Sequence, residues 1–131
     1  MSIDTIGNFL TCIRNSLMVS KASVKTPYSK MNHGIANILL EEGFIRGIEV
    51  VKSEKDFDML SLQLKYVQNE SVIHELTRIS SPKCRVYAGA RKIKHVKGGL
   101  GFSILTTPKG IMTNKKARKL SVGGELLCVV W

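Results

Sequence analysis

One segment, Gly101-Phe-Ser-Ile-Leu-Thr-Thr-Pro-Lys-Gly-Ile-Met-Thr-Asn-Lys-Lys-Ala-Arg118, predicts a strand, a break and a helix in close succession. The apolar residues 102–105 predict the strand, and Thr106-Thr107-Pro108-Lys109-Gly110 ends it. Thr113 is suited to begin a short basic helix. The break offers hydroxyls, the fixed φ of Pro108, an ammonium group and glycine backbone, which are suited to contacting sugar and phosphate oxygens. None of these groups titrates near neutral pH, so the segment indicates an RNA-contacting loop rather than acid–base catalysis.

The positive charge of the chain is concentrated in its second half. The 131 residues have a net charge of +10. Residues 1–70 contain eight Lys or Arg and eight Asp or Glu, whereas residues 71–131 contain twelve Lys or Arg against only Glu75 and Glu125. This asymmetry predicts a polyanionic partner for residues 71–131. No stretch pairs the basic residues with a long amphipathic helix carrying bulky apolar anchors, so nucleic acid is favoured and no membrane partner is expected.

Residues 1–70 predict an N-terminal α/β lobe with two helices and a three-stranded sheet. Helical spacing of apolar residues indicates an amphipathic helix over residues 4–19. A second helix begins at Ser29 or Asn32 and ends before Gly43, which suits a left-handed cap. Residues 22–25 predict a short strand, and residues 44–51 and 57–66 predict a β-hairpin.

Residues 71–131 predict a β-rich C-terminal lobe with one short helix, which makes the whole chain an α+β fold of two small lobes. Strands are expected at residues 72–80 and 85–87, joined at Ser81-Pro82-Lys83. Two more are expected at residues 102–107 and 125–131. A basic connection over residues 88–98 precedes the third of these four strands.

Few residues suggest catalysis, a metal or a cofactor. Cys12, Cys84 and Cys128 are odd in number and far apart, which predicts buried, reduced thiols rather than a disulfide framework or a zinc site. Gly99-x-Gly101 lacks the third glycine of a dinucleotide fingerprint and precedes its strand instead of following it. Asp56-x-Asp58 has no third acidic ligand nearby and suits a solvated turn. We therefore expect no enzymatic activity, no metal and no cofactor.

Further candidate RNA contacts surround the central loop. RNA duplexes present a wide, shallow minor groove lined with 2′-hydroxyls, which Thr106 and Thr107 at a strand end could reach. Ordinary turn chemistry is an equally good interpretation of these two threonines. The cationic or aromatic candidates in the strands, the basic connection and the helix are Arg78, Arg85, Tyr87, Arg91, Lys94, Lys115, Lys116 and Arg118.

Several motifs together resemble one known family. Residues 101–118 are similar to the signature of the small-subunit ribosomal protein eight family, of bacterial or plastid type. Leu10-Thr-Cys-Ile-Arg-Asn15 is similar to its N-terminal helix, and residues 35–45 are similar to its second helix and following strand. Arg78-Ile-Ser-Ser-Pro82 with Arg85-Val-Tyr87 resembles its central basic hairpin, and Gly123-Gly-Glu-Leu-Leu-Cys128 resembles its last strand. The resemblance covers nearly the whole chain.

The resemblance implies a structural constituent of the small ribosomal subunit. Family members bind the central domain of small-subunit ribosomal RNA, mainly through the C-terminal half, and help to assemble the platform. The implied protein partners are neighbouring small-subunit proteins, numbers five and twelve. The implied RNA contacts are the loop residues Thr106, Thr107, Lys109 and Gly110, with Tyr87, Gly124 and Glu125 at the same surface and Lys30 as a second contact. Glu125 is expected to order the loop or to accept a hydrogen bond from a base.

Three residues depart from the family pattern. Pro108 replaces a usual third hydroxyl residue of the loop, Cys12 replaces a usual basic residue, and Ala88 follows Tyr87 where a basic residue is common. We therefore expect RNA contacts to shift toward residues 91–97.

The resemblance leaves two questions open, the compartment of the protein and whether its function is ribosomal. The C-terminal sequence Cys128-Val-Val-Trp131 is similar to plastid and cyanobacterial members, which favours the plastid stroma over the bacterial cytoplasm. The alternative functions are a non-ribosomal RNA binder and a translational regulator that binds its own messenger RNA. The regulator would use the same surface as the ribosomal protein.

Overall fold

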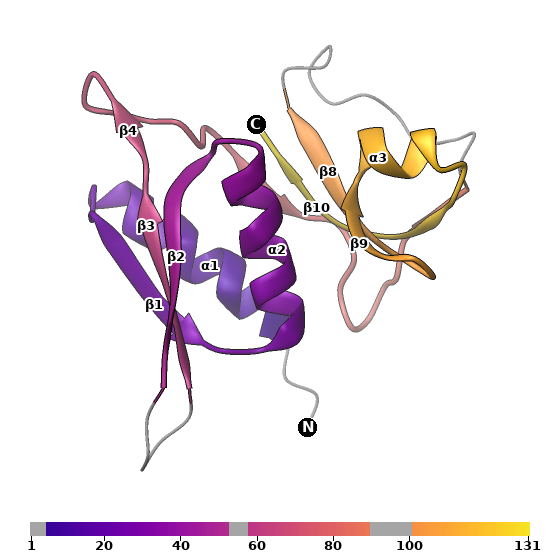
Figure 1. Ribbon diagram of the computed structural model, residues 1–131, viewed down its shortest axis with the longest axis horizontal. Coiled ribbons are helices and arrows are strands. Elements are labelled where there is room, and N and C mark those ends of the chain that lie inside the picture. The colour runs from indigo at the N-terminus through magenta and orange to yellow at the C-terminus, as the bar shows by residue number, and fades with distance from the viewer. Residues whose placement is uncertain (1–4, 53–57, 90–100) are drawn as a thin grey trace. The chain divides into compact units, whose positions relative to one another are not determined.

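The computed structural model describes residues 5–52, 58–89 and 101–131. They form an α+β fold, as predicted, and divide into two compact units (Figure 1), one over residues 5–73 and the other over the described residues from 74 to 131.

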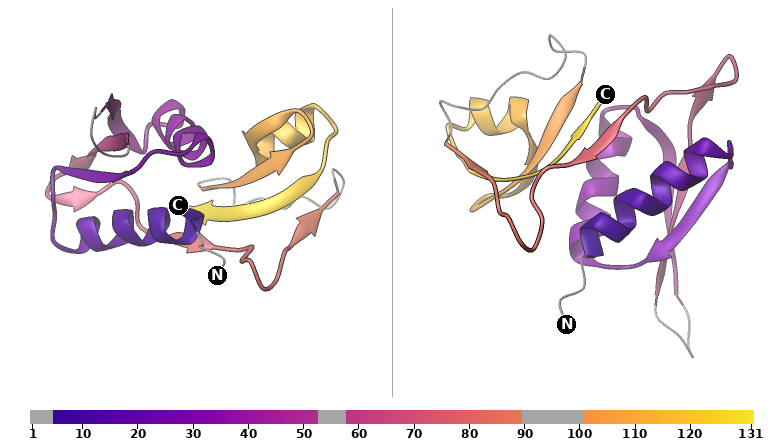
Figure 2. Two further views of the ribbon diagram at one scale, coloured as in Figure 1. Left: turned by 90° about the horizontal axis from the view of Figure 1, so that it is seen from below. Right: turned by 180° about the vertical axis from the view of Figure 1, so that it is seen from behind.

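The first unit is a three-stranded antiparallel sheet with two helices against one face. Val24 and Thr26 pair with Leu62 and Leu60, so these four side chains share a face, and all are buried. The first helix packs on the first strand and the second helix on the second strand (Figures 1 and 2). The elements are α1 (Thr5–Met18), β1 (Ser23–Pro27), α2 (Lys30–Glu41), β2 (Ile45–Val51) and β3 (Met59–Leu64), with strand order β1-β3-β2.

Both predicted ends of α2 are confirmed. The Oγ of Ser29 accepts a hydrogen bond from the Asn32 amide at 3.0 Å, which satisfies one of the free N–H groups at the start of the helix. Gly43 has a φ of +80°, and the following Phe44 amide donates to the Leu39 carbonyl. A side chain with a Cβ rarely adopts this backbone conformation, so glycine allows the chain to turn directly into β2.

A small hairpin at the end of the first unit was not predicted. It consists of β4 (Tyr66–Val67) and β5 (Glu70–Ser71), joined by two residues with positive φ, Gln68 at 53° and Asn69 at 65°. Glutamine seldom occupies such a position, so the sequence carries no ordinary turn signal here. The Tyr66 hydroxyl anchors the hairpin by donating to the Lys21 carbonyl at 2.7 Å.

The second unit is a five-stranded antiparallel sheet with a short helix against one face (Figure 2). The helix packs through Ala117 onto Leu105 and Met112, all three of them buried. The prediction of a β-rich lobe with one short helix is therefore confirmed. The elements are β6 (Leu76–Arg78), β7 (Tyr87–Ala88), β8 (Phe102–Thr107), β9 (Gly110–Thr113), α3 (Asn114–Lys119) and β10 (Gly124–Val130), with strand order β6-β10-β8-β9 and β7 also paired with β10.

The prediction that the strands on either side of Ser81-Pro82-Lys83 form a hairpin is wrong. β6 and β7 both pair antiparallel with β10, so they run in the same direction and form one interrupted strand. Ser81 and Cys84 exchange backbone hydrogen bonds of 2.9 and 3.1 Å, which close a small loop. The Oγ of Ser80 accepts from the Val86 amide at 2.9 Å and donates to its carbonyl at 3.2 Å, so the chain resumes its course after the loop.

The three cysteines differ in exposure. All are free thiols, as predicted, but Cys12 is half-buried and Cys84 is exposed, so the prediction of buried thiols is correct only for Cys128. Burial raises the pKa of Cys128 to about 12, although the charge of Arg78 acts in the opposite direction.

Candidate nucleic-acid interface

The predicted central loop is the turn of a β-hairpin. β8 and β9 pair as far as Thr107 and Gly110, so only Pro108 and Lys109 form the turn. β9 was missed because four residues before a helix carry little periodicity. Pro108, Lys109 and Gly110 are exposed, and Gly110 has a φ of +114°, which favours glycine.

Thr107 stabilises this turn. Its hydroxyl donates to the Gly110 carbonyl at 2.8 Å and accepts from the Lys109 amide at 3.2 Å. Only 9 % of the residue is exposed, and its oxygen lies 3.8 Å from the sulfur of Met112. Turn chemistry therefore accounts for the Thr107 hydroxyl, and its contact with RNA stays a prediction.

Thr107→Ala is expected to lower the free energy of unfolding by about 1–2 kcal/mol, because it leaves the turn without two hydrogen bonds. Thr107→Ser keeps the hydroxyl and should recover most of this loss. Urea denaturation of the two variants and the wild type measures the difference. Equal losses in both variants would show that the methyl group, packed beside Met112, is what matters.

Three candidate residues are aligned across neighbouring strands on one face of the sheet. Glu125 of β10 pairs with Tyr87 of β7 on one side and with Thr106 of β8 on the other. Directly paired residues project from the same face, so we call these three residues the Tyr87 row. Tyr87 is 70 % exposed, whereas Thr106 is half-buried. The row offers an aromatic ring, a carboxylate and a hydroxyl side by side.

Arg85 is held at the same face by an ion pair. It precedes Tyr87 by two positions, and its Nη1 lies 3.2 Å from the Oε2 of Glu125. The Arg85 side chain is 48 % exposed and the Glu125 side chain only 12 %. The more exposed guanidinium is therefore paired with a carboxylate that is mostly buried at the surface of the sheet.

Gly124 allows β10 to approach β8 closely. A Cβ at this position would lie 2.1 Å from the Thr106 carbonyl oxygen and 3.1 Å from the Cα of Thr107. Both are backbone atoms of the paired strand, so no side-chain movement would relieve the overlap. This close approach gives Gly124 a packing role beside the Tyr87 row, and a direct contact of Gly124 with RNA stays a prediction.

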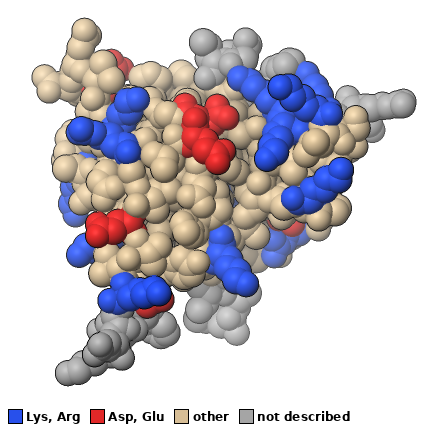
Figure 3. Space-filling model, in the orientation of Figure 1, with Lys and Arg blue, Asp and Glu red and all other residues tan. Residues whose placement is uncertain are grey.

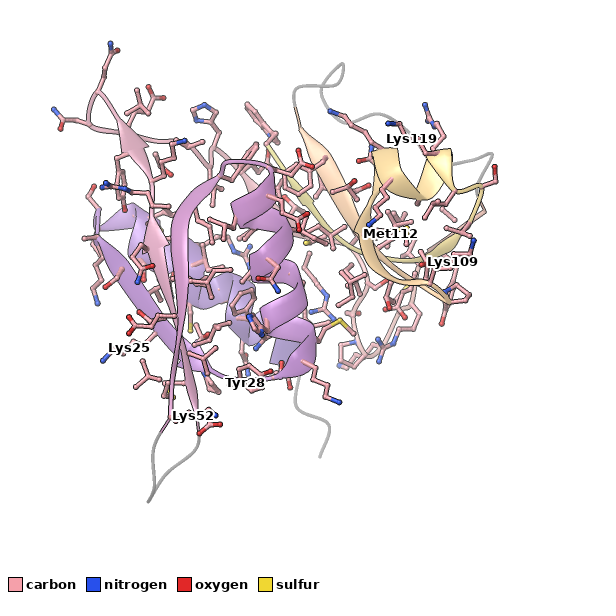
Figure 4. The ribbon with its side chains drawn as sticks, viewed as in Figure 1. Lys25, Tyr28, Lys52, Lys109, Met112 and Lys119 are labelled. Carbon is pink, nitrogen blue, oxygen red and sulfur yellow. The ribbon has the colours of Figure 1, made fainter. Side chains whose placement is uncertain are left out.

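α3 begins as predicted. The Thr113 hydroxyl accepts from the Lys116 amide at 3.3 Å, and the Asn114 side-chain oxygen accepts from the Ser103 amide at 3.3 Å. The first bond caps the helix and the second fixes its start to β8. The basic side chains gather over α3 (Figure 3), and Figure 4 shows Lys119 on α3 above Met112 of β9. The exposed cations of the helix are Lys115, Lys116, Arg118 and Lys119.

The predicted RNA-binding surface divides between the two faces of the sheet. Leu105, Leu126 and Ala88 pack on the α3 side. Each is the chain neighbour of a member of the Tyr87 row, and successive residues of a strand point to opposite faces. The row therefore faces away from α3 and its cations. Lys109 lies in the turn between β8 and β9, at the end of the sheet, and belongs to neither face (Figure 4).

The remaining candidates are not members of the Tyr87 row. Arg78 is half-buried, donates from its Nε to the Ser80 carbonyl and pairs with Cys128 further along β10. Lys30 is exposed at the first position of α2, in the other unit. Arg91 and Lys94 fall outside the described residues.

The described ranges contain neither a cluster of metal-ligating residues nor a membrane-spanning helix. No three His, Cys, Asp or Glu residues gather there as a metal ion would require. No helix in the described part of the chain combines the length and hydropathy needed to cross a membrane.

Comparison with known proteins gives full-length matches. The model of the family described as Ribosomal protein S8 matches residues 4–131. The small ribosomal subunit protein uS8 of Acetivibrio thermocellus is 51 % identical over 129 residues, which cover 98 % of this chain and 97 % of that protein. The proteins of the same name from Paracidovorax citrulli and Paracoccus denitrificans are 50 % and 47 % identical, over 97 % and 98 % of this chain and 96 % and 97 % of their own lengths.

Proposed function

The chain belongs to the Ribosomal protein S8 family, and from this membership we propose that it is a structural constituent of the small ribosomal subunit that binds ribosomal RNA. The match over residues 4–131 is the observation that carries this function. The family is structural rather than enzymatic, so the chain is not an enzyme.

The RNA target and the binding surface can be proposed more specifically. We propose that the chain binds the central domain of small-subunit ribosomal RNA through its second unit. The charge excess of residues 71–131 supports this, as does the grouping of Tyr87, Glu125 and Thr106 on one face. An exposed aromatic ring can stack on a base, and exposed lysines can neutralise phosphates.

The proposed function implies protein neighbours, a competing RNA and a cellular compartment. Small-subunit proteins five and twelve are proposed as neighbours, and the messenger RNA of the protein itself would compete for the same surface. The relatives compared above are bacterial, which favours the bacterial cytoplasm over the plastid stroma suggested by the C-terminal sequence. The comparisons do not favour a non-ribosomal RNA binder.

Co-sedimentation with ribosomal subunits tests the function. The protein should remain with the small subunit after a high-salt wash and should be absent from the large subunit. Complete release at high salt, or equal amounts on both subunits, would indicate a general RNA binder.

Lys116→Ala is expected to weaken binding to all RNAs alike, because an exposed ammonium contacts phosphates and reads no bases. The slope of log affinity against log salt concentration should fall by about one counterion. Filter binding at several salt concentrations measures the slope. Lys25→Ala is the matched control, since Lys25 is an exposed lysine of the neutral unit and should leave the slope unchanged.

A further inference from the structure

The three-stranded sheet of the first unit has two edge strands, β1 and β2. In an antiparallel ladder, the N–H and C=O groups of alternate residues point toward one neighbouring strand, and those of the residues between them point the other way. The Leu64 amide donates to the Ala22 carbonyl, so the even-numbered residues of β3 bond to β1. The odd-numbered residues of β3 therefore bond to β2.

Two residues of β2 have backbone groups that point away from the sheet. The β2 partners of the odd-numbered β3 residues are residues 47, 49 and 51. The N–H and C=O groups of Ile48 and Val50, which lie between them, therefore point outward. Within the described ranges, no other backbone group bonds to them. This free edge of β2 can accept one more strand.

The side chains of Ile48 and Val50 are also incompletely covered. They pair with Leu62 and Leu60 of β3, which places them on the face that carries the helices. Both leucines are completely buried, whereas Ile48 is half-buried and Val50 is 36 % exposed. A further strand beside β2 would bury these two apolar side chains and bond their backbone groups at the same time.

The β1 edge is less suited to a further strand. By the same alternation, its outward residues are Ser23, Lys25 and Pro27. Proline has no N–H to donate, and the Pro27 carbonyl already accepts from the Asn32 side chain at 3.4 Å. β2 contains no proline. The sheet is therefore open to extension at β2 rather than at β1.

The charge beside the free edge of β2 indicates a basic partner. Residues 41–51 contain three glutamates and one arginine, although the chain as a whole has a net charge of +10. Acidic side chains gather over the C-terminal end of α2 (Figure 3), where Glu41 and Glu42 are exposed. Glu49 projects from the face opposite the helices, pairs across β3 with Ser61 and forms no ion pair with a described residue. These carboxylates would repel the phosphates of RNA, which favours a basic protein segment.

We infer that the free edge of β2 binds an extended segment of another protein, which adds a fourth strand to the sheet and places a lysine or arginine opposite Glu49. Residues of opposite charge that face each other on neighbouring strands stabilise the pairing. The residues on either side of that cation would be apolar and would cover Ile48 and Val50. The inference concerns the first unit alone and does not depend on RNA binding by the second unit.

Peptide titration of the full chain tests the inference. The probe is a peptide as long as β2 in which lysine and valine alternate, and the control peptide alternates glutamate and valine. At saturation, the lysine peptide should slow hydrogen exchange of the Ile48 and Val50 amides about tenfold and leave that of Lys25 unchanged. Unchanged exchange at Ile48 and Val50 would overturn the inference.

An N-methylated peptide tests the mode of binding without altering the protein. Methylation of the valine nitrogens removes the donors that would bond to the outward carbonyls of β2, so this lysine peptide should not bind. Val50→Pro makes the complementary change, because it removes one outward N–H and leaves the bonds from β2 to β3 in place. It should weaken binding more than Val50→Ala, which keeps the amide. Binding of the methylated peptide as tight as that of the parent would contradict strand addition.

A charge reversal tests the partner's chemistry. Glu49→Lys should weaken binding of the lysine peptide about fivefold, the value of one favourable cross-strand ion pair, and should strengthen binding of the glutamate peptide. Glu70→Lys is the matched control, since Glu70 is an exposed glutamate in the β4–β5 hairpin, outside this sheet. Equal effects of the two variants would show that Glu49 does not select the partner.

Self-association is the competing outcome. If the Ile48 and Val50 amides are protected in concentrated protein without peptide, and sedimentation equilibrium shows a dimer, the occupant of this edge is a second copy of the chain. The inference of another protein as partner would then be wrong. A monomer with unprotected amides is the expected result.

Discussion

Gly124→Ala should lower the free energy of unfolding by about 3 kcal/mol, the upper end of the cost of adding an atom to a well-packed site. The added Cβ would lie 2.1 Å from the Thr106 carbonyl oxygen. Since this atom belongs to the backbone of β8, the two strands must separate where Glu125 pairs with Thr106. The Tyr87 row would be distorted, so cognate RNA binding should weaken together with stability.

Urea denaturation measures the change, and Gly89→Ala is the matched control. A Cβ at Gly89 meets no atom of the described residues within 4 Å, so this variant should stay within about 0.5 kcal/mol of the wild type. If Gly124→Ala were as mild as Gly89→Ala, the close approach of β10 to β8 would not need glycine.

Ile13→Asp is expected to cost about 3–5 kcal/mol, because it places an unpaired charge in the core of the first unit. Ile13 is completely buried on α1, and Phe9 and Leu10 of the same helical stripe are buried as well. Thermal or urea denaturation detects the loss.

Asn15→Asp tests whether the effect depends on the buried face of α1. Asn15 is exposed two positions further along the helix. An aspartate introduced there should therefore change the free energy of unfolding very little. Similar destabilisation by Ile13→Asp and Asn15→Asp would mean that the helical face has been assigned incorrectly.

Elements specified by local patterns could be predicted from the sequence. α1 follows from its apolar period, and α2 from that period together with Ser29 and Gly43, residues whose capping roles depend only on their chain neighbours. The prediction for residues 76–88 was wrong because the pairing of this segment depends on a distant part of the chain. A strand, a proline-containing turn and a second strand look like a hairpin. Both strands instead pair with β10, about forty to fifty residues away along the chain, and no local pattern indicates that pairing.

In the candidate site too, the sequence predicts the features that depend on chain neighbours and misses those that depend on distant segments. The composition of the loop and the cap at Thr113 predicted a turn and a helix where the structure has them. Three features depend on distant segments, and local patterns do not predict them, although the family resemblance implied that Tyr87 and Glu125 share a surface with the loop. They are the alignment of Tyr87 with Glu125 and Thr106, the ion pair of Arg85, and the steric demand at Gly124.

We propose that the second unit recognises small-subunit RNA through the Tyr87 row, while the cations of α3 bind without selecting a sequence. Titration of Tyr87→Ala and Lys116→Ala with the central-domain transcript and an unrelated duplex, over a range of salt concentrations, tests it most directly. Tyr87→Ala should reduce the cognate preference by about 1–3 kcal/mol, the value of one stacked base, without changing the salt slope. Lys116→Ala should lower the slope and keep the preference. If the two variants are indistinguishable in both quantities, the row is only part of a basic surface and the account is wrong.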